Sequence, residues 1–200
     1  MELTCGIVSN LTGAGRVTLT QRLWRRLLFA TIAMIALTSV PTTAQSAAAP
    51  ELKAAFLLNF VRFTEWPDIA PDDPLLLCVF GDERVFDALN GAARAQRVES
   101  HRIQVSQVAG EAPWKKCQLV FVGGFELRGT EAFLNAVRTS PVLTVSDRSR
   151  FAQSAGMVEL FAEDGRMRFA VNMDSVQRAH LRLSSRLLRL AKIVRNDDLR

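Results

Sequence analysis

Apolar side chains recur every three or four positions in four segments of the chain, and this spacing predicts amphipathic helices. The expected helices span residues 51–66, 84–93, 130–138 and 174–194. Pro67 ends the first helix, whose apolar face is rich in phenylalanine. Asp174 or Ser175 is expected to cap the last helix, because short polar side chains accept hydrogen bonds from the free N–H groups of a first turn.

Strand patterns lie between these helices. Continuous apolar runs, typical of strands buried on both faces, occupy residues 75–80, 119–122 and 142–145. Residues 101–108 alternate between polar and apolar side chains, as do 157–161 and 167–171, and Asp164-Gly165 between the last two predicts a hairpin. This order predicts an α/β fold: a single three-layer sandwich with a mostly parallel sheet, a C-terminal hairpin and flanking helices.

The beginning of the chain has a different pattern. Four arginines precede an uncharged apolar run at residues 27–40, which is followed by Pro41 and small residues. This order is typical of a secretory signal peptide, and the run is shorter than the about 20 residues that a spanning helix needs. We expect residues 1–48 to be signal peptide and leader, cut after Ala44 or Ala48, and residues 49–200 to be a periplasmic domain. An uncleaved membrane anchor is the alternative, and a start site assigned too far upstream would explain the weak pattern of residues 1–20.

Loss of the leader changes the charge of the protein. The whole chain has 25 basic and 20 acidic residues, a net charge of +5, and residues 1–44 hold four of the basic residues but only one acidic residue, Glu2. The remainder has 21 basic and 19 acidic residues, a net charge of +2. Nucleic-acid-binding proteins carry a concentrated basic face, so we expect no nucleic-acid partner.

The cysteines give a second clue to the compartment. Cys5 lies in the leader, which leaves Cys78 and Cys117 in the remainder. In an oxidising compartment an even pair favours one disulfide, and both cysteines lie at or just before apolar runs that neighbouring strands could bring together. Two buried free thiols are the alternative.

Small and acidic residues follow three of the predicted buried strands. In parallel sheets ligands bind beyond the carboxyl ends of the strands. A candidate ligand crevice is therefore formed by Gly81, Asp82, Gly123, Ser146 and Asp147. Ordinary turn chemistry is the alternative, because glycine, aspartate and serine favour turns whatever their function.

The sequence contains no recognisable catalytic motif. His101 and His180 are the two histidines, and no metal-spaced cluster, nucleophile elbow or glycine-rich phosphate loop occurs. We therefore expect no enzymatic activity, no cofactor and no metal. A hydrolase that uses Asp82 or Asp147 is the remaining enzymatic alternative.

The last predicted helix carries two stripes of side chains. Its apolar seam consists of Val176, His180, Leu183, Leu187, Leu190 and Val194. A basic ridge on another face consists of Arg178, Arg182, Arg186 and Arg189. The ridge is either solvated or docks an acidic partner or anionic lipid. Together with Trp66, a residue type favoured at interfaces, it forms a candidate partner surface.

An ordered set of segments across about residues 51–194 resembles the YfiR family. The matching segments include Lys53-Ala54-Ala55-Phe56-Leu57, Trp66-Pro67, Cys78-Val79-Phe80-Gly81-Asp82, Cys117-Gln118-Leu119-Val120-Phe121-Val122, Val142-Leu143-Thr144-Val145-Ser146-Asp147 and Arg168-Phe169-Ala170-Val171-Asn172. The resemblance implies a periplasmic α/β domain that forms a homodimer or higher oligomer and contains a Cys78–Cys117 disulfide.

The resemblance also implies a function. It implies a regulator that binds the sensory domain of an inner-membrane signalling protein, represses a diguanylate cyclase and so lowers cyclic di-GMP and biofilm formation. The family's repressor has a second cysteine pair near the segment that matches residues 151–159, whereas this chain has none there. Related domains serve as sensory inputs, so a small-molecule-binding module that uses the strand-end crevice is the alternative.

Overall fold

The structure is a computed structural model that describes residues 50–195, apart from 68, 110–113 and 124–129. The predicted signal peptide and both predicted cleavage sites lie outside the described residues. The described part contains an eight-stranded sheet in the order β10-β8-β7-β6-β5-β2-β4-β3. Its strands are β2 (Leu75–Phe80), β3 (Arg97–Val98), β4 (His101–Val108), β5 (Leu119–Val122), β6 (Leu143–Ser146), β7 (Val158–Glu163), β8 (Arg166–Asn172) and β10 (Lys192–Val194).

Most neighbouring strands of this sheet run parallel. The β2/β4, β2/β5, β5/β6, β6/β7 and β8/β10 pairs are parallel, and the β7/β8 and β3/β4 pairs are antiparallel. Asp164 and Gly165, both with positive φ (51° and 71°), form the turn between β7 and β8, as a tight hairpin requires. The mostly parallel sheet and the C-terminal hairpin confirm the predicted fold class.

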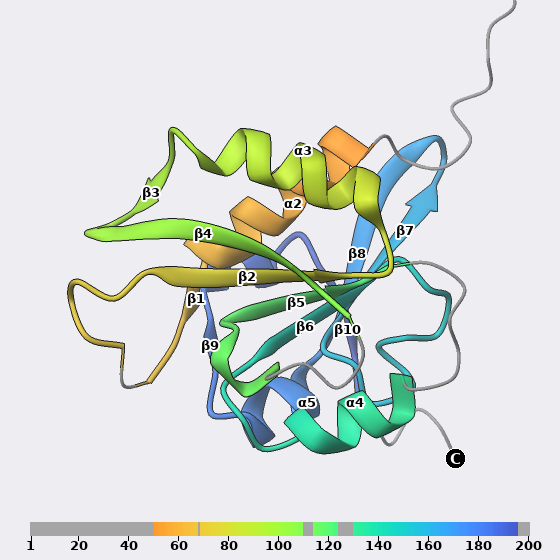
Figure 1. The fold of residues 1–200 in the computed structure, drawn as a ribbon. Coiled ribbons are helices and arrows are strands. Elements are labelled where there is room, and N and C mark those ends of the chain that lie inside the picture. The colour runs from red at the N-terminus through yellow and green to blue at the C-terminus, as the bar shows by residue number, and fades with distance from the viewer. Residues whose placement is uncertain (1–49, 68, 110–113, 124–129, 196–200) are drawn as a thin grey trace, which may run out of the picture. The chain divides into compact units, whose positions relative to one another are not determined.

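Helices cover both faces of the sheet. The helices α2 (Pro50–Arg62) and α3 (Glu83–Ala93) lie on one face, and α4 (Thr130–Val137) lies on the other (Figure 1). On the α2/α3 side, Leu57, Phe60 and Leu89 are fully buried against every second residue of the central strands. The intervening strand residues, such as Val120 and Cys78, point to the other face and join a second apolar cluster with Phe133 of α4. This two-sided burial explains the continuous apolar runs of the central strands.

The prediction of one long final helix is wrong. The segment divides into α5 (Met173–Arg178), β9 (Arg182–Leu183), α6 (Ser185–Leu188) and β10. His180 has a φ of 56°, a left-handed conformation that ends α5. The capping prediction is also wrong, because the side chain of Asn172, not that of Asp174 or Ser175, accepts a hydrogen bond from Ser175 N–H.

Long-range pairing explains the break in this segment. The strand β9 pairs antiparallel with β1 (Thr64–Glu65), which directly follows α2 and Phe63. The same pairing ends the first helix at Arg62, four residues before the predicted end, and there the Thr64 hydroxyl donates to the Phe60 carbonyl. Ser184 then caps α6 through its side chain, so that two short helices replace one long one.

Candidate functional site

The three strand ends that form the candidate crevice meet in the structure. The strands β2, β5 and β6 are direct neighbours, and Phe80, Val122 and Ser146 lie in register across them. Parallel strands end at the same edge of a sheet, so the residues that follow each strand lie side by side there. The three strand ends named from the sequence are therefore adjacent, which is the condition on which the candidate crevice depends.

The backbones at these strand ends approach closely. Gly81 has a φ of 77°, and a Cβ atom built on it would lie 2.5 Å from the Gly123 carbonyl oxygen. A Cβ atom on Gly123 would in turn lie 2.6 Å from the Cβ atom of Asp82. Both distances are shorter than the van der Waals contact of a Cβ atom allows, so both positions need glycine.

A lysine from the first helix lies between the two acidic residues of the crevice. The Lys53 ammonium lies 2.6 Å from Asp147 Oδ2 and 3.7 Å from Asp82 Oδ2. The Lys53 side chain is 8% exposed, and those of Asp82 and Asp147 are 13% and 28% exposed. The ammonium also lies 6.0 Å from the centroid of the Phe121 ring. One cation therefore bridges two largely buried carboxylates and leaves the trio with a net charge of −1.

Lys53 was not among the predicted site residues. It occupies a position one helical turn before Leu57, on the buried face of α2. A charge on the apolar face of an amphipathic helix is unusual, because a buried charge needs a partner of opposite sign. That anomaly is the sequence signal that would have pointed to Lys53.

The other crevice residues also make structural contacts. Asp82 caps α3, since its Oδ1 accepts a hydrogen bond from Val85 N–H at 3.2 Å. The buried Ser146 hydroxyl donates to the Val122 carbonyl at 2.6 Å and accepts from Arg148 N–H at 3.1 Å. Ordinary structural chemistry therefore accounts for the contacts of these side chains, while Asp147 is the carboxylate with most access to solvent.

The predicted disulfide is present. Cys78 and Cys117 are bonded, with 6.0 Å between their Cα atoms and a sequence separation of 39. Both are buried, and the bond joins β2 to the segment that leads into β5. It lies among the apolar side chains of the α4 side, so solvent reaches it poorly.

The members of the predicted partner surface have different surroundings in the structure. Arg178 is half-buried and donates to the Ser175 hydroxyl at 2.8 Å, and its Nε is buried without a hydrogen-bond partner among the described residues. Arg182 lies in β9 directly opposite Glu65 of β1. Trp66 is half-buried and donates from Nε1 to the Gln118 carbonyl at 3.0 Å.

Near the end of the described chain, two arginines of the predicted partner surface are accompanied by exposed apolar side chains that the sequence pattern did not predict. Arg186 and Arg189 are exposed at α6, Leu190 is 70% exposed and Ile193 is 43% exposed. We name these four residues the C-terminal patch. The predicted apolar seam is therefore wrong at Leu190, because the chain leaves α6 there instead of continuing as a helix. His180 of that seam is exposed as well.

Two further properties concern the described ranges of the chain. Within them, none of the helices is both long and apolar enough to cross a bilayer. Nor do those ranges contain a group of three or more His, Cys, Asp or Glu side chains placed to hold a metal ion. Within the described part of the chain, the strand ends thus carry a bridged pair of carboxylates rather than a cluster of metal ligands.

A comparison with known families gives one match that extends over most of the described residues. The sequence profile described as DUF4154, YfiR/HmsC-like, matches residues 50–192. The match begins at the first residue of α2 and ends at the first residue of β10. It therefore includes the central sheet, the disulfide and the Lys53 bridge.

Proposed function

The chain belongs to the YfiR/HmsC-like family, and on that premise we propose that it is a non-enzymatic periplasmic regulator that binds the sensory domain of an inner-membrane signalling protein. Family membership supports a regulatory, non-catalytic role in the diguanylate cyclase pathway. The finer proposal is that the protein represses a diguanylate cyclase and so lowers cyclic di-GMP. The profile match over residues 50–192 is the observation that carries this proposal.

The C-terminal patch supports a protein partner. Interfaces are rich in arginine and in large apolar side chains, and the patch presents Leu190 and Ile193 beside Arg186 and Arg189. Burial of exposed leucine and isoleucine side chains stabilises a complex, and the arginines favour acidic groups on the partner. We also propose a homodimer, which sedimentation equilibrium of the purified protein tests directly.

A deletion strain tests the regulatory proposal. Loss of the protein should raise cyclic di-GMP, and the wild-type gene should restore the lower level. Ile193→Ser should fail to restore it, whereas Leu52→Ser serves as a matched control, because Leu52 is 42% exposed but lies on α2. An unchanged cyclic di-GMP level in the deletion strain, with no membrane partner found by crosslinking, would contradict the proposal.

The second candidate function is a small-molecule sensor that uses the strand-end crevice. The observation that favours it is the meeting of the three strand ends, where the Asp147 carboxylate remains 28% exposed. A thermal-shift screen with amino acids and polyamines tests it. A ligand of this site should lose its shift in Asp147→Asn, and a shift that survives both Asp147→Asn and Asp82→Asn would exclude the crevice.

A further inference from the structure

The strand β4 leaves one long edge of the sheet open. Its inner edge pairs with β2 along residues 103–108, but its outer edge pairs only with the two-residue strand β3, at His101 and Arg102. From Ile103 to Val108, no strand of the described chain covers the outer edge. An edge strand is usually protected by lysine, proline or a covering element, and residues 103–108 contain no charge and no proline.

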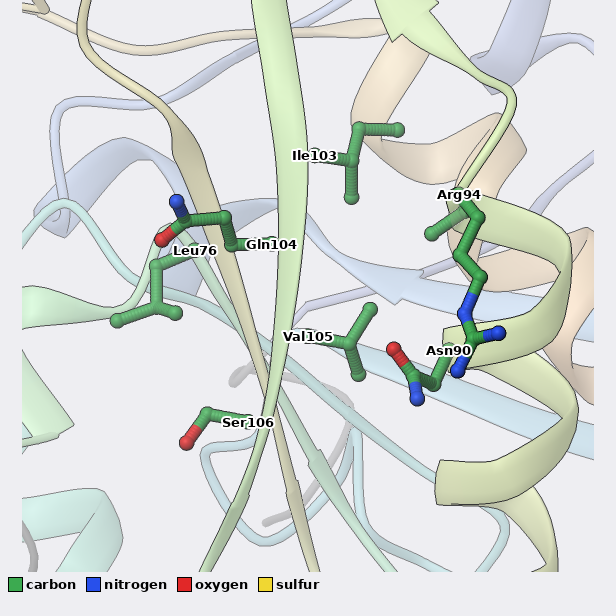
Figure 2. Close-up of a pocket in the computed structure, with 8 residues that line it drawn as sticks. Leu76, Asn90, Arg94, Ile103, Gln104, Val105 and Ser106 are labelled. Carbon is green, nitrogen blue, oxygen red and sulfur yellow. The ribbon is translucent and has the colours of Figure 1, made fainter.

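A hollow of about 450 Å³ lies at this same edge. Figure 2 shows Ile103 and Val105 on the side of β4 that faces Asn90 of α3 and Arg94, which follows that helix, while Gln104 and Ser106 lie on the other side of β4 with Leu76. The hollow is thus lined by residues from both faces of the edge strand. A strand added beside β4 needs such a space, because its side chains point alternately to the two faces.

Three exposed arginines surround the open edge. Arg94 lines the hollow, and Arg97 of β3 lies directly opposite Arg102 of β4. Like charges at directly opposite positions destabilise an antiparallel pair. Among the described residues, none of the three forms an ion pair. The edge therefore combines a strand edge without a partner strand with arginines that form no ion pair among the described residues.

We propose that the outer edge of β4 binds an acidic extended segment of a partner protein by strand addition. Backbone hydrogen bonds to residues 103–108 provide affinity, as in other complexes in which a strand joins a sheet edge. Acidic side chains of the segment lie near Arg94 on one face and near Arg97 and Arg102 on the other. This proposal deepens the proposed function, since it rests on the existence of a protein partner and assigns a second surface to it, in addition to the C-terminal patch.

A second copy of the chain fits the edge less well. The strand β4 has no acidic residue from His101 to Val108, so self-pairing leaves all three arginines without a counter-charge. A partner segment with both apolar and acidic side chains on each of its faces complements the apolar residues of the edge and the arginines on both sides of it. Charge complementarity thus selects an acidic partner over self-association.

The test uses a fluorescent peptide of repeated Val-Val-Glu-Glu units, which place valine and glutamate on both faces of a strand, added to the purified protein. We expect saturable binding in fluorescence anisotropy and slower hydrogen exchange of the amides of residues 103–108. Arg94→Glu should weaken binding at least tenfold. Arg84→Glu, which makes the same charge change at an exposed position on α3 away from the hollow, should change it less than twofold.

Two control peptides separate strand addition from other kinds of binding. A peptide with lysine in place of glutamate, and the acidic peptide with alternate backbone amides N-methylated, should both bind at least tenfold more weakly. Equal binding of either control, or no binding of the acidic peptide, overturns the proposal. So does exchange protection of residues 103–108 that rises with protein concentration without peptide, which means self-pairing. None of these readouts involves cyclic di-GMP, so this inference and the proposed function can fail separately.

Discussion

Lys53 Nζ lies 2.6 Å from Asp147 Oδ2, although 94 residues separate the two in the chain. The contact ties the first turns of α2 to the carboxyl end of β6, and Asp82 at the end of β2 completes the bridge. The two contacts thereby attach α2, which covers the sheet, to the ends of β2 and β6. The stability of the contact between α2 and these strand ends should depend on the positive charge of Lys53.

Lys53→Met should destabilise the fold by about 2–4 kcal/mol, because removal of one partner leaves two largely buried carboxylates without their cation. Urea unfolding followed by far-UV circular dichroism measures the change. Lys116→Met, at an exposed position, is the control and should change the stability by no more than about 0.5 kcal/mol. Equal effects of the two substitutions would mean that the bridge contributes nothing.

Asp82 serves both the bridge and the cap of α3, and two substitutions separate these roles. Asp82→Asn removes the charge but keeps an oxygen that can accept from Val85 N–H. Asp82→Ala removes both, so it should cost about 1 kcal/mol more than Asp82→Asn, which is the usual value of an N-cap. Equal unfolding free energies for the two variants would rule out the capping role.

Gly81→Ala should be far more damaging than Gly165→Ala. The two glycines have similar positive φ values, 77° and 71°, so both substitutions carry the same backbone strain of about 1–2 kcal/mol. A Cβ atom on Gly165 meets nothing within 4 Å, whereas one on Gly81 meets the Gly123 carbonyl oxygen. Gly81→Ala should therefore lower the unfolding free energy by about 1–3 kcal/mol more than Gly165→Ala, the usual cost of an overpacked site. This difference measures the close approach of the two strand ends.

The disulfide should contribute a large share of the total stability. The bond closes a loop of 39 positions, and the chain-entropy model assigns such a loop about 4 kcal/mol. The double variant Cys78→Ala and Cys117→Ala should lower the unfolding free energy by about that amount. A thiol assay on the denatured, non-reduced protein should find neither cysteine free, and detection of both thiols would contradict the bond.

Arg97→Glu should stabilise the isolated protein. The substitution places a carboxylate directly opposite Arg102 in the β3/β4 pair, where two positive charges now face each other. Cross-strand pairs of opposite charge contribute about 0.2–1 kcal/mol, so the midpoint of thermal unfolding should rise slightly. Arg97→Gln should give a smaller gain, and a loss of stability in both variants would show that the arginine pair is not unfavourable.

Local patterns were enough to predict most of the central sheet. The strands at residues 75–80, 101–108 and 119–122 have the predicted bounds, because buried runs, alternation and turn residues act over a few positions. The same kind of pattern was misleading at the end of the chain. Apolar residues from Val176 to Leu190 follow helical spacing, yet the pairing of β9 with β1 overrides it.

In the candidate site too, local features could be predicted from the sequence and long-range contacts could not. The three strand ends were predictable, because each glycine or aspartate follows a buried run. Lys53 was not, because its role depends on α2 crossing the sheet at the point where β2 and β6 end. The exposure of Leu190 could not be predicted from the sequence for a similar reason, because it depends on where α6 ends.

The disulfide also has a consequence for the protein under mechanical load. It encloses α3, β3 and β4 in a covalent ring that runs from Cys78 to Cys117. When force is applied to the two ends of the chain, this ring cannot extend, and tension passes directly through the sulfur–sulfur bond. The fully stretched oxidised chain is therefore shorter than the reduced chain by roughly 120–140 Å, the length that 39 extended residues span.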